Sequence, residues 1–120
     1  MKRILVIEDT EDNRQIVGDL LSSAGYELIE AVDRLEGVAT AEREQPDLIL
    51  MDIQLPGIDG YEATRRIRKI AALAKVPIIA VTSYALSGDE AKTREAGCDG
   101  YVAKPYSPRQ LLAKVREFLP

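Results

Sequence analysis

The sequence predicts an α/β domain built on an open, doubly wound parallel sheet of five strands with five helices. Short runs of apolar and β-branched residues alternate with longer stretches whose apolar residues recur at helical spacing. This alternation is typical of parallel strands joined by right-handed crossovers, with helices on both faces of the sheet. Five strands favour an open sheet over a closed barrel. A chain of 120 residues is the size of one domain, so we expect residues 1–120 to form a single unit.

The five expected strands differ in how apolar they are. Residues 3–7, 47–51 and 77–81 are nearly continuous apolar runs, as expected for strands covered on both faces. Residues 27–32 alternate between polar and apolar positions, which indicates an edge strand. Residues 100–103 form the fifth and shortest strand.

The stretches between the strands carry start and stop signals for helices. An acidic or hydroxyl residue followed three positions later by Glu or Gln is typical of a helix start, and a glycine after the apolar stripe is typical of a helix end. The start signals are Asp33 with Glu36, Asp59 with Glu62, Ser87 with Glu90, and Ser107 with Pro108 and Gln110, and the stop signals are Gly25 and Gly97.

Composition excludes several classes of function. The net charge of −4 and the pI of about 4.9 argue against binding nucleic acid through the field of the whole domain. The basic run 65–69 is therefore interpreted as the solvated face of a helix. The chain has no histidine, which excludes catalytic triads that need His as a base and zinc sites with His ligands. A single cysteine, Cys98, excludes an internal disulfide and is expected to be a buried, inert thiol.

Nothing in the sequence indicates a membrane segment. No stretch approaches the roughly 18 apolar residues of a membrane-spanning helix. The N-terminus enters a strand directly, without the apolar region of a signal peptide. We therefore expect a cytoplasmic protein that does not contact membranes.

Polar side chains follow four of the five expected strands. Glu8 and Asp9 come after the first strand, Asp52 after the third, Thr82 after the fourth and Lys104 after the fifth. Functional groups of open α/β sheets gather beyond the carboxyl ends of the strands. Taken singly, each residue has an ordinary explanation: Asp9 as a helix cap, Asp52 as a turn residue, Thr82 and Lys104 as strand ends. Their joint placement predicts one acidic pocket.

The chemistry of this pocket is that of phosphoryl transfer with a divalent ion. Clustered carboxylates repel one another unless a cation intervenes, and ligation by oxygen alone suits Mg²⁺. Lys104 can contact a phosphoryl oxygen, and Thr82 can donate or accept a hydrogen bond. Asp52 would then act as a nucleophile toward phosphorus, giving an aspartyl-phosphate.

These motifs resemble the receiver domain of two-component response regulators, in particular the stand-alone type without an output domain. The resemblance extends from residue 2 to residue 119. It implies a flavodoxin-like sheet with strand order 2-1-3-4-5, and a signalling switch that phosphorylates and dephosphorylates itself but turns over no metabolite. The segments that carry the resemblance are 6–9, 50–60, 79–83 and 101–106.

The resemblance also implies a role for each site residue. Asp52 would accept a phosphoryl group from a phosphohistidine of a sensor histidine kinase or a histidine phosphotransfer protein. Lys104 would form an ion pair with that group, and Thr82 would move to contact it. Tyr101 would change rotamer together with Thr82. The Mg²⁺ ligands would be Asp9, Asp52, the backbone carbonyl of Gln54, and Glu8 through water.

The same resemblance implies a partner surface formed by the fourth helix, the fifth strand and the fifth helix. Three tyrosines, Tyr84, Tyr101 and Tyr106, would mark this face. A downstream protein target would bind there, and a homodimer through this face also stays open. Neither nucleic acid nor membrane is expected as a direct partner.

Three other classes fit the sequence less well. A phosphatase of the haloacid dehalogenase class needs an Asp-x-Asp motif, but the residue two positions after Asp52 is Gln54. A flavin or nucleotide binder needs a glycine-rich phosphate loop after the first strand, whereas residues 8–12 are mostly acidic. A receiver that acts only as an unphosphorylated scaffold would not need the complete set of acids, Thr82 and Lys104.

Overall fold

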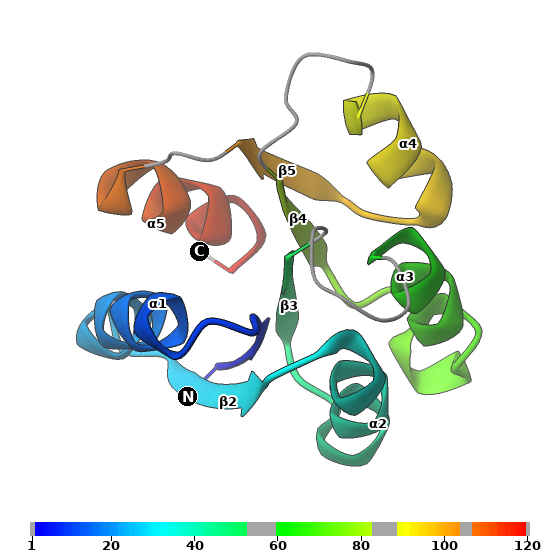
Figure 1. Ribbon diagram of the computed structural model, residues 1–120, viewed down its shortest axis with the longest axis horizontal. Helices are drawn as coiled ribbons and strands as arrows, with labels where there is room; N and C mark the ends of the chain where they lie inside the picture. The colour runs from blue at the N-terminus through cyan, green and yellow to red at the C-terminus, as the bar shows by residue number, and fades with distance from the viewer. Residues whose placement is uncertain (1, 53–59, 83–88, 104–106, 120) are drawn as a thin grey trace.

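The predicted parallel sheet is present in the computed structural model, which describes residues 2–52, 60–82, 89–103 and 107–119. All neighbouring strands are parallel, and their order is β2-β1-β3-β4-β5 (Figure 1). This order confirms the one that the resemblance implied. The strands are β1 (Arg3–Ile7), β2 (Glu27–Ala31), β3 (Leu48–Asp52), β4 (Ile78–Thr82) and β5 (Gly100–Ala103).

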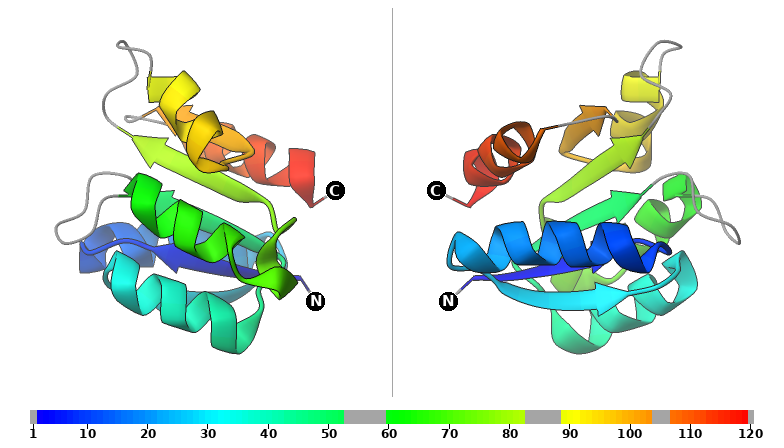
Figure 2. Two further views of the ribbon diagram at one scale, coloured as in Figure 1. Left: turned by 90° about the vertical axis from the view of Figure 1, so that its right-hand side faces the viewer. Right: turned by 60° about the vertical axis from the view of Figure 1, so that its left-hand side comes forward.

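Helices cover both faces of the sheet. Figures 1 and 2 show α1 and α5 on one face, and α2, α3 and α4 on the other. No helix in the described part of the chain has the length and apolar character that a bilayer crossing requires. The helices are α1 (Glu11–Ser23), α2 (Arg34–Glu44), α3 (Gly60–Arg68), α4 (Asp89–Ala96) and α5 (Pro108–Phe118), with a short 3-10 turn, η1 (Ala71–Leu73).

The sheet separates two apolar cores. Because side chains alternate along a strand, β1 sends Ile4 and Val6 toward α1 and α5, and Leu5 and Ile7 toward α2 and α3. Strand β3 divides its side chains in the same way. This burial on both faces explains why the central strands are apolar along their whole length.

The helix signals that fall within the described residues are confirmed. The Asp33 carboxylate accepts a hydrogen bond from the Glu36 amide at 2.8 Å, and Ser107 with Gln110 forms a complete capping box. Gly25 follows the end of α1 with a φ of 95°, a conformation that glycine adopts without strain. The expected starts at Asp59 and Ser87 lie outside the described residues.

The observed elements differ from the expected ranges by a few residues. Strands β3 and β4 each begin and end one residue later, so Asp52 and Thr82 are the last residues of their strands. The sheet continues to them because Asp52 pairs with Val81, and Thr82 pairs with the backbone of the fifth strand. Helix α3 ends at Arg68, so Ile70, which continues the apolar spacing of Ala63 and Ile67, does not lie on it. Its amide bonds to the carbonyl of Ile67, three residues back, and the 3-10 turn follows.

Candidate functional site

Two of the expected acids come together at the carboxyl ends of neighbouring strands. Strand β1 pairs with β3 up to Ile7 and Met51, so the next residues, Glu8 and Asp52, lie side by side. Both belong to the alternation that points toward α1 and α5. Glu8 is 7% exposed and Asp52 is 6% exposed. Two carboxylates are therefore largely removed from water at one edge of the sheet.

Glu8 and Asp52 line one small cavity. The remaining lining residues are apolar and come from the central strands and from α1 and α5; they are Val6, Ile7, Val17, Leu50, Val81 and Leu111. The cavity has a volume of about 20 Å³, room for roughly one water molecule. Pockets that hold cofactors or drug-sized ligands are many times larger, on the order of 300–1,000 Å³. The cavity therefore suits a water or a small ion rather than a flavin or nucleotide.

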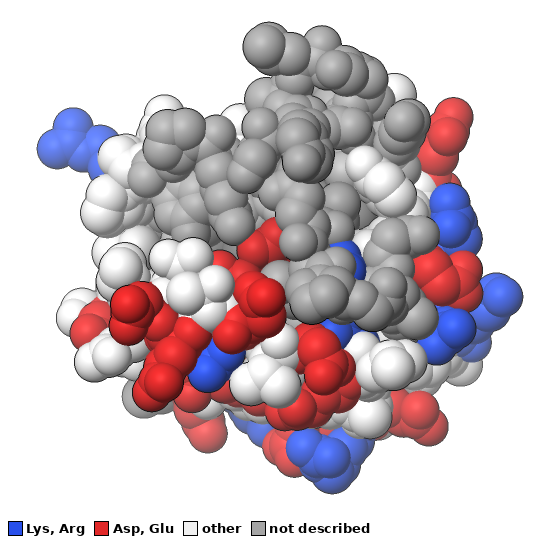
Figure 3. Space-filling model, viewed as in Figure 1, with Lys and Arg blue, Asp and Glu red and all other residues white. Residues whose placement is uncertain are grey.

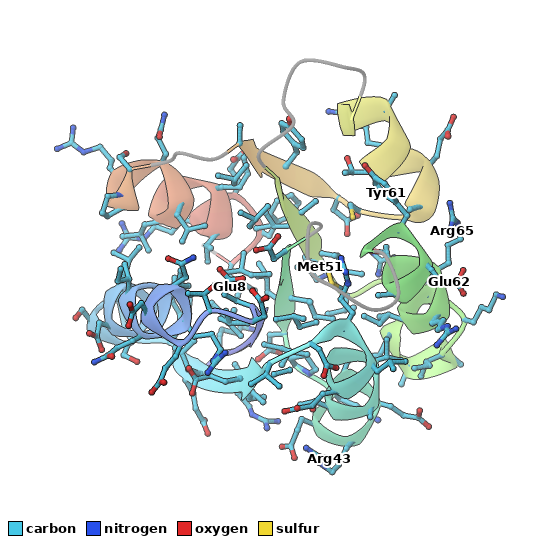
Figure 4. The ribbon with its side chains drawn as sticks, in the orientation of Figure 1. Glu8, Arg43, Met51, Tyr61, Glu62 and Arg65 are labelled. Atoms are coloured by element: carbon cyan, nitrogen blue, oxygen red, sulfur yellow. The ribbon has the colours of Figure 1, made fainter. Side chains whose placement is uncertain are left out.

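Residues at the start of α1 hold the Glu8 side chain and its backbone in place. Asn13 donates from Nδ2 to Glu8 Oε1 at 2.9 Å, and the Asp9 amide donates to Glu8 Oε2 at 3.1 Å (Figure 4 labels Glu8 between α1 and β3). Arg14 donates from Nη1 to the backbone carbonyls of Glu8 and Asp9 at 2.8 and 3.1 Å. Sequence reasoning missed Asn13 and Arg14, because polar residues in a first helical turn carry no distinctive signal.

Asp9 has a different environment from Glu8. Asp9 is exposed, and its carboxylate accepts a hydrogen bond from the hydroxyl of Thr10 at 3.3 Å. The N-cap of α1 is Thr10, so Asp9 does not cap that helix. Among the described residues, no three acidic, cysteine or histidine side chains already converge as metal ligands. The three expected acids thus comprise two buried carboxylates and one that faces solvent.

The other expected site residues are placed only in part. The backbone of Thr82 ends β4 and pairs with Ala103 of β5. Tyr101 lies half-buried in β5, beside a surface groove that α5 completes. The remaining expected residues, Gln54, Tyr84, Lys104 and Tyr106, lie outside the described residues.

The residues present fit a hard divalent cation. Two buried carboxylates side by side repel each other, and a cation between or beside them removes that repulsion. The atoms they offer as ligands are all oxygens, and such a set suits Mg²⁺ better than it suits softer metals. Asn13 and the Asp9 amide hold the Glu8 carboxylate in one orientation.

Charge is distributed unevenly over the surface around this edge. Figure 3 shows acidic side chains gathered over α1 and the adjacent chain, and basic side chains over α3. On α3, Arg65 and Arg66 form ion pairs with Glu62 at 3.8 and 3.1 Å, and both arginines are exposed. The interpretation of this basic run as a solvated face is confirmed for Arg65 and Arg66. Arg68 differs, because it points inward and bonds to backbone carbonyls.

Cys98 is confirmed as a buried thiol. Its Sγ lies 3.7 Å from the hydroxyl of Thr64, and the residue is 6% exposed. Burial raises the pKa of the Cys98 thiol above its ordinary value. A neutral, enclosed thiol takes no part in the acidic site.

Comparison with known protein families gives one clear match. The model for the response regulator receiver domain matches residues 4–116. Curated relatives include polar-differentiation response regulator DivK of Brucella anthropi and of Brucella ovis. Each is 39% identical over 118 residues, covering 98% of this chain and 96% of the relative.

Solved structures with the same fold agree with this match. The receiver domain of sensor histidine kinase PA1611 from Pseudomonas aeruginosa has a TM-score of 0.91 and 39% identity, covering 98% of this chain and 97% of that one. That structure has a magnesium ion coordinated in its active-site cleft. Chemotaxis protein CheY4 of Vibrio cholerae has a TM-score of 0.93 and 28% identity, covering 98% of both chains.

Proposed function

The chain belongs to the response regulator receiver domain family, and on that premise we propose that it is a phosphorylation switch whose phosphoacceptor is Asp52. The observation that carries the proposal is the pair of buried carboxylates, Glu8 and Asp52, side by side at the ends of β1 and β3. A receiver is a signalling switch rather than a classical enzyme. The chain would therefore transfer a phosphoryl group to and from itself without turning over a metabolite.

In the proposed reaction a carboxylate oxygen of Asp52 attacks the phosphorus of a phosphohistidine. The new bond joins that oxygen to phosphorus, and the bond from phosphorus to the imidazole nitrogen breaks. The electron pair stays on the imidazole nitrogen, which then takes a proton. The low exposure of Asp52 would limit, without abolishing, the access of water to the new acyl-phosphate.

Mg²⁺ is the proposed cofactor. It would be held by Asp9, Asp52, the backbone carbonyl of Gln54, and Glu8 through water. Bound Mg²⁺ supplies charge neutralisation for the carboxylates and for the oxygens of the transferred group. A magnesium ion in the cleft of the PA1611 receiver domain supports this assignment.

Two further side chains would convert phosphorylation into a change of shape. Lys104 would pair with the phosphoryl group, and Thr82 would turn toward it. Tyr101 would follow Thr82; it lies on β5 two residues before Ala103, the backbone partner of Thr82. The described groove between β5 and α5 lies beside Tyr101, which makes it part of the proposed partner face together with Tyr84 and Tyr106.

The proposed partners are proteins. A sensor histidine kinase or a histidine phosphotransfer protein would supply the phosphoryl group, and a downstream protein would bind the switched face. The matches to DivK, which is named as a response regulator of polar differentiation in Brucella, support a regulatory role of this kind.

Phosphorylation of the intact protein tests the proposal directly. Incubation with acetyl phosphate and Mg²⁺, followed by intact-mass analysis, should show one added phosphoryl group in the wild type. Asp52→Asn should abolish it, because an amide oxygen is a poor nucleophile. Asp19→Asn is the matched control, since Asp19 is an exposed acid on α1, and it should be labelled like the wild type. Equal labelling of Asp52→Asn, or no labelling of the wild type, would overturn the proposal.

A further inference from the structure

One arginine is fully buried at the start of the helix that follows β2. Arg34 opens α2 and is 1% exposed, and it has the largest side chain among the fully buried residues that the structure describes. Arginine is almost never fully buried without compensating charge or hydrogen bonds, because removing its charge from water is costly. The position of Arg34 therefore needs a physical reason.

The helix places Arg34 at the same edge of the sheet as Glu8 and Asp52. The Glu8 amide donates to the carbonyl of Ala31, the last residue of β2, at 3.1 Å, and α2 starts three residues later. The left view of Figure 2 shows α2 starting at the end of the molecule toward which the strand arrows point. Arg34 thus begins its helix beside the point where β1 ends.

Close packing of α2 against β1 fixes this position. A Cβ atom added to Gly37 would lie 2.5 Å from Cδ1 of Ile7, so the backbone of α2 sits directly on that side chain. Arg34 lies about one helical turn nearer the helix start than Gly37. That offset runs in the direction from Ile7 to Glu8, so Arg34 lies at the level of the acidic residues along the strand axis, although α2 itself packs on the opposite face of the sheet from α1 and α5. This tight packing fixes α2 along the sheet, and so fixes the position of the Arg34 backbone.

The local electrostatics of α2 do not favour a cation at this place. The start of a helix carries partial positive charge, so arginine in the first turn is disfavoured by the helix dipole as well as by burial. The negative charges at this edge stabilise a cation instead. Asp33 caps the helix, and Glu8, Asp9 and Asp52 lie at the ends of β1 and β3. Charges that are buried are screened by salt much less than charges at the surface.

We propose that Arg34 is a built-in counter-charge for the acidic site, a positioning residue that sets how tightly the site binds Mg²⁺. Its positive charge offsets the repulsion among the carboxylates when no cation is bound. The same charge repels a bound divalent cation and so keeps the affinity for Mg²⁺ moderate. The inference rests on the proposed function, because it takes Mg²⁺ as the ion that the carboxylates bind.

The test is a Mg²⁺ titration of the unphosphorylated full chain by calorimetry. Arg34→Met removes the charge and keeps a long apolar side chain, so it should tighten Mg²⁺ binding by about threefold or more. Arg34→Lys keeps the charge and should stay close to the wild type. Arg43→Met is the matched control, because Arg43 is exposed at the other end of the same helix. It should leave the affinity unchanged.

Thermal unfolding supplies a second readout for the same variants. Arg34→Met should lower the midpoint without Mg²⁺ and increase the rise of the midpoint that Mg²⁺ produces. A variant that folds only with Mg²⁺ present would support the proposal in the same way. If Arg34→Met does not fold even with saturating Mg²⁺, Arg34 serves packing alone and the proposal is overturned.

Two outcomes of the titration would also overturn it. Unchanged or weaker Mg²⁺ binding by Arg34→Met would show that the charge of Arg34 does not act on the site. Equal tightening by Arg34→Lys and Arg34→Met would show that side-chain shape, not charge, is responsible. Failure of the proposed function is distinguishable, because it appears in the wild type itself as absence of both Mg²⁺ binding and phosphorylation.

Discussion

Two neighbouring acids, Glu8 and Asp9, have opposite environments in the structure. Glu8 is buried and accepts hydrogen bonds from Asn13 and from the Asp9 amide. Asp9 is exposed, and its carboxylate contacts the hydroxyl of Thr10. Holding Glu8 in one orientation and leaving Asp9 at the surface suits an ion that arrives from solvent, because the exposed acid can meet it first. The contact between Asn13 of α1 and Glu8, rather than residue type, distinguishes these two adjacent carboxylates.

Cys98 gives a prediction at the residue scale. Burial raises the pKa of its thiol, so the folded chain keeps this proton to higher pH than the unfolded chain does. The stabilisation is complete below the pKa of the unfolded thiol, about 8.5, and is lost as the pH rises toward the folded value. Urea unfolding at several pH values should therefore show a steeper loss of stability above about pH 8.5 for the wild type than for Cys98→Ser. Parallel pH profiles for the two proteins would contradict this account.

Residue patterns indicated the candidate acids but not the residues that hold them in place. Asp52 was recognisable because a charge that ends a strongly apolar run needs a reason. Asn13 was not, since polar residues in a first helical turn are ordinary. Its role depends on a hydrogen bond to Glu8, five residues earlier in the chain. Arg34 also gave no signal, because a charged residue after a helix cap normally lies in water. Burial of such residues depends on packing between elements, which periodicity does not report.

At the scale of elements, Arg68 joins four segments near the amino ends of β4 and β5, at the opposite end of the strands from the site. Its guanidinium donates from Nη1 to the Val76 carbonyl at 2.5 Å, and from Nε to the Gly97 carbonyl, after α4, at 2.9 Å. Nη1 also bonds to the Leu73 carbonyl of η1, and Nη2 pairs with Asp99 at 2.5 Å. One side chain at the end of α3 thereby satisfies carbonyls of the turn before β4 and of the turn after α4.

This arrangement predicts that Arg68→Lys is not a conservative change. A lysine ammonium cannot donate to the same set of separated acceptors as the planar guanidinium does. The free energy of unfolding should therefore fall by about 2–3 kcal/mol. Arg65→Lys is the control, because Arg65 on the same helix is exposed and its ion pair is long. That change should cost less than about 0.5 kcal/mol. Urea unfolding measures both, and equal losses would show that Arg68 does not join the segments as described.

Element boundaries were predicted where local chemistry decides them. The start of α2 at Asp33 and the capping box at Ser107 depend on residues within one turn, and both were recognisable. The end of α3 was not, because the apolar residue Ile70 continues the helical spacing. Bonds from Arg68 to carbonyls beyond the helix stabilise the turn that follows, and these contacts depend on the arrangement of α3 against β4 and α4. Long-range contacts of this kind leave no local pattern.

At the scale of the whole molecule, the proposed Mg²⁺ site would link metal binding to folding. The net charge is −4, acidic side chains gather over α1 (Figure 3), and the two carboxylates of Glu8 and Asp52 are buried. Folding brings these carboxylates together, so part of the folding free energy is spent on their repulsion. An ion that binds only the folded chain raises the free energy of unfolding with the logarithm of its concentration, once that concentration exceeds the dissociation constant. The domain should therefore be a marginal fold without Mg²⁺ and a firmer one with it.

This linkage predicts that Mg²⁺ raises the free energy of unfolding by about 2.7 kcal/mol at a concentration one hundred times its dissociation constant. Asp52→Asn should be at least as stable as the wild type without Mg²⁺, because it relieves repulsion at Glu8, and should gain less from the ion. Urea unfolding with Mg²⁺, and with NaCl at the same ionic strength, separates specific binding from general screening. Equal stabilisation by the two salts would mean that the acidic edge responds to ionic strength alone. Equal gains for Asp52→Asn and the wild type would place the ion elsewhere on the acidic surface, because a site that uses Asp52 must weaken when that carboxylate is removed.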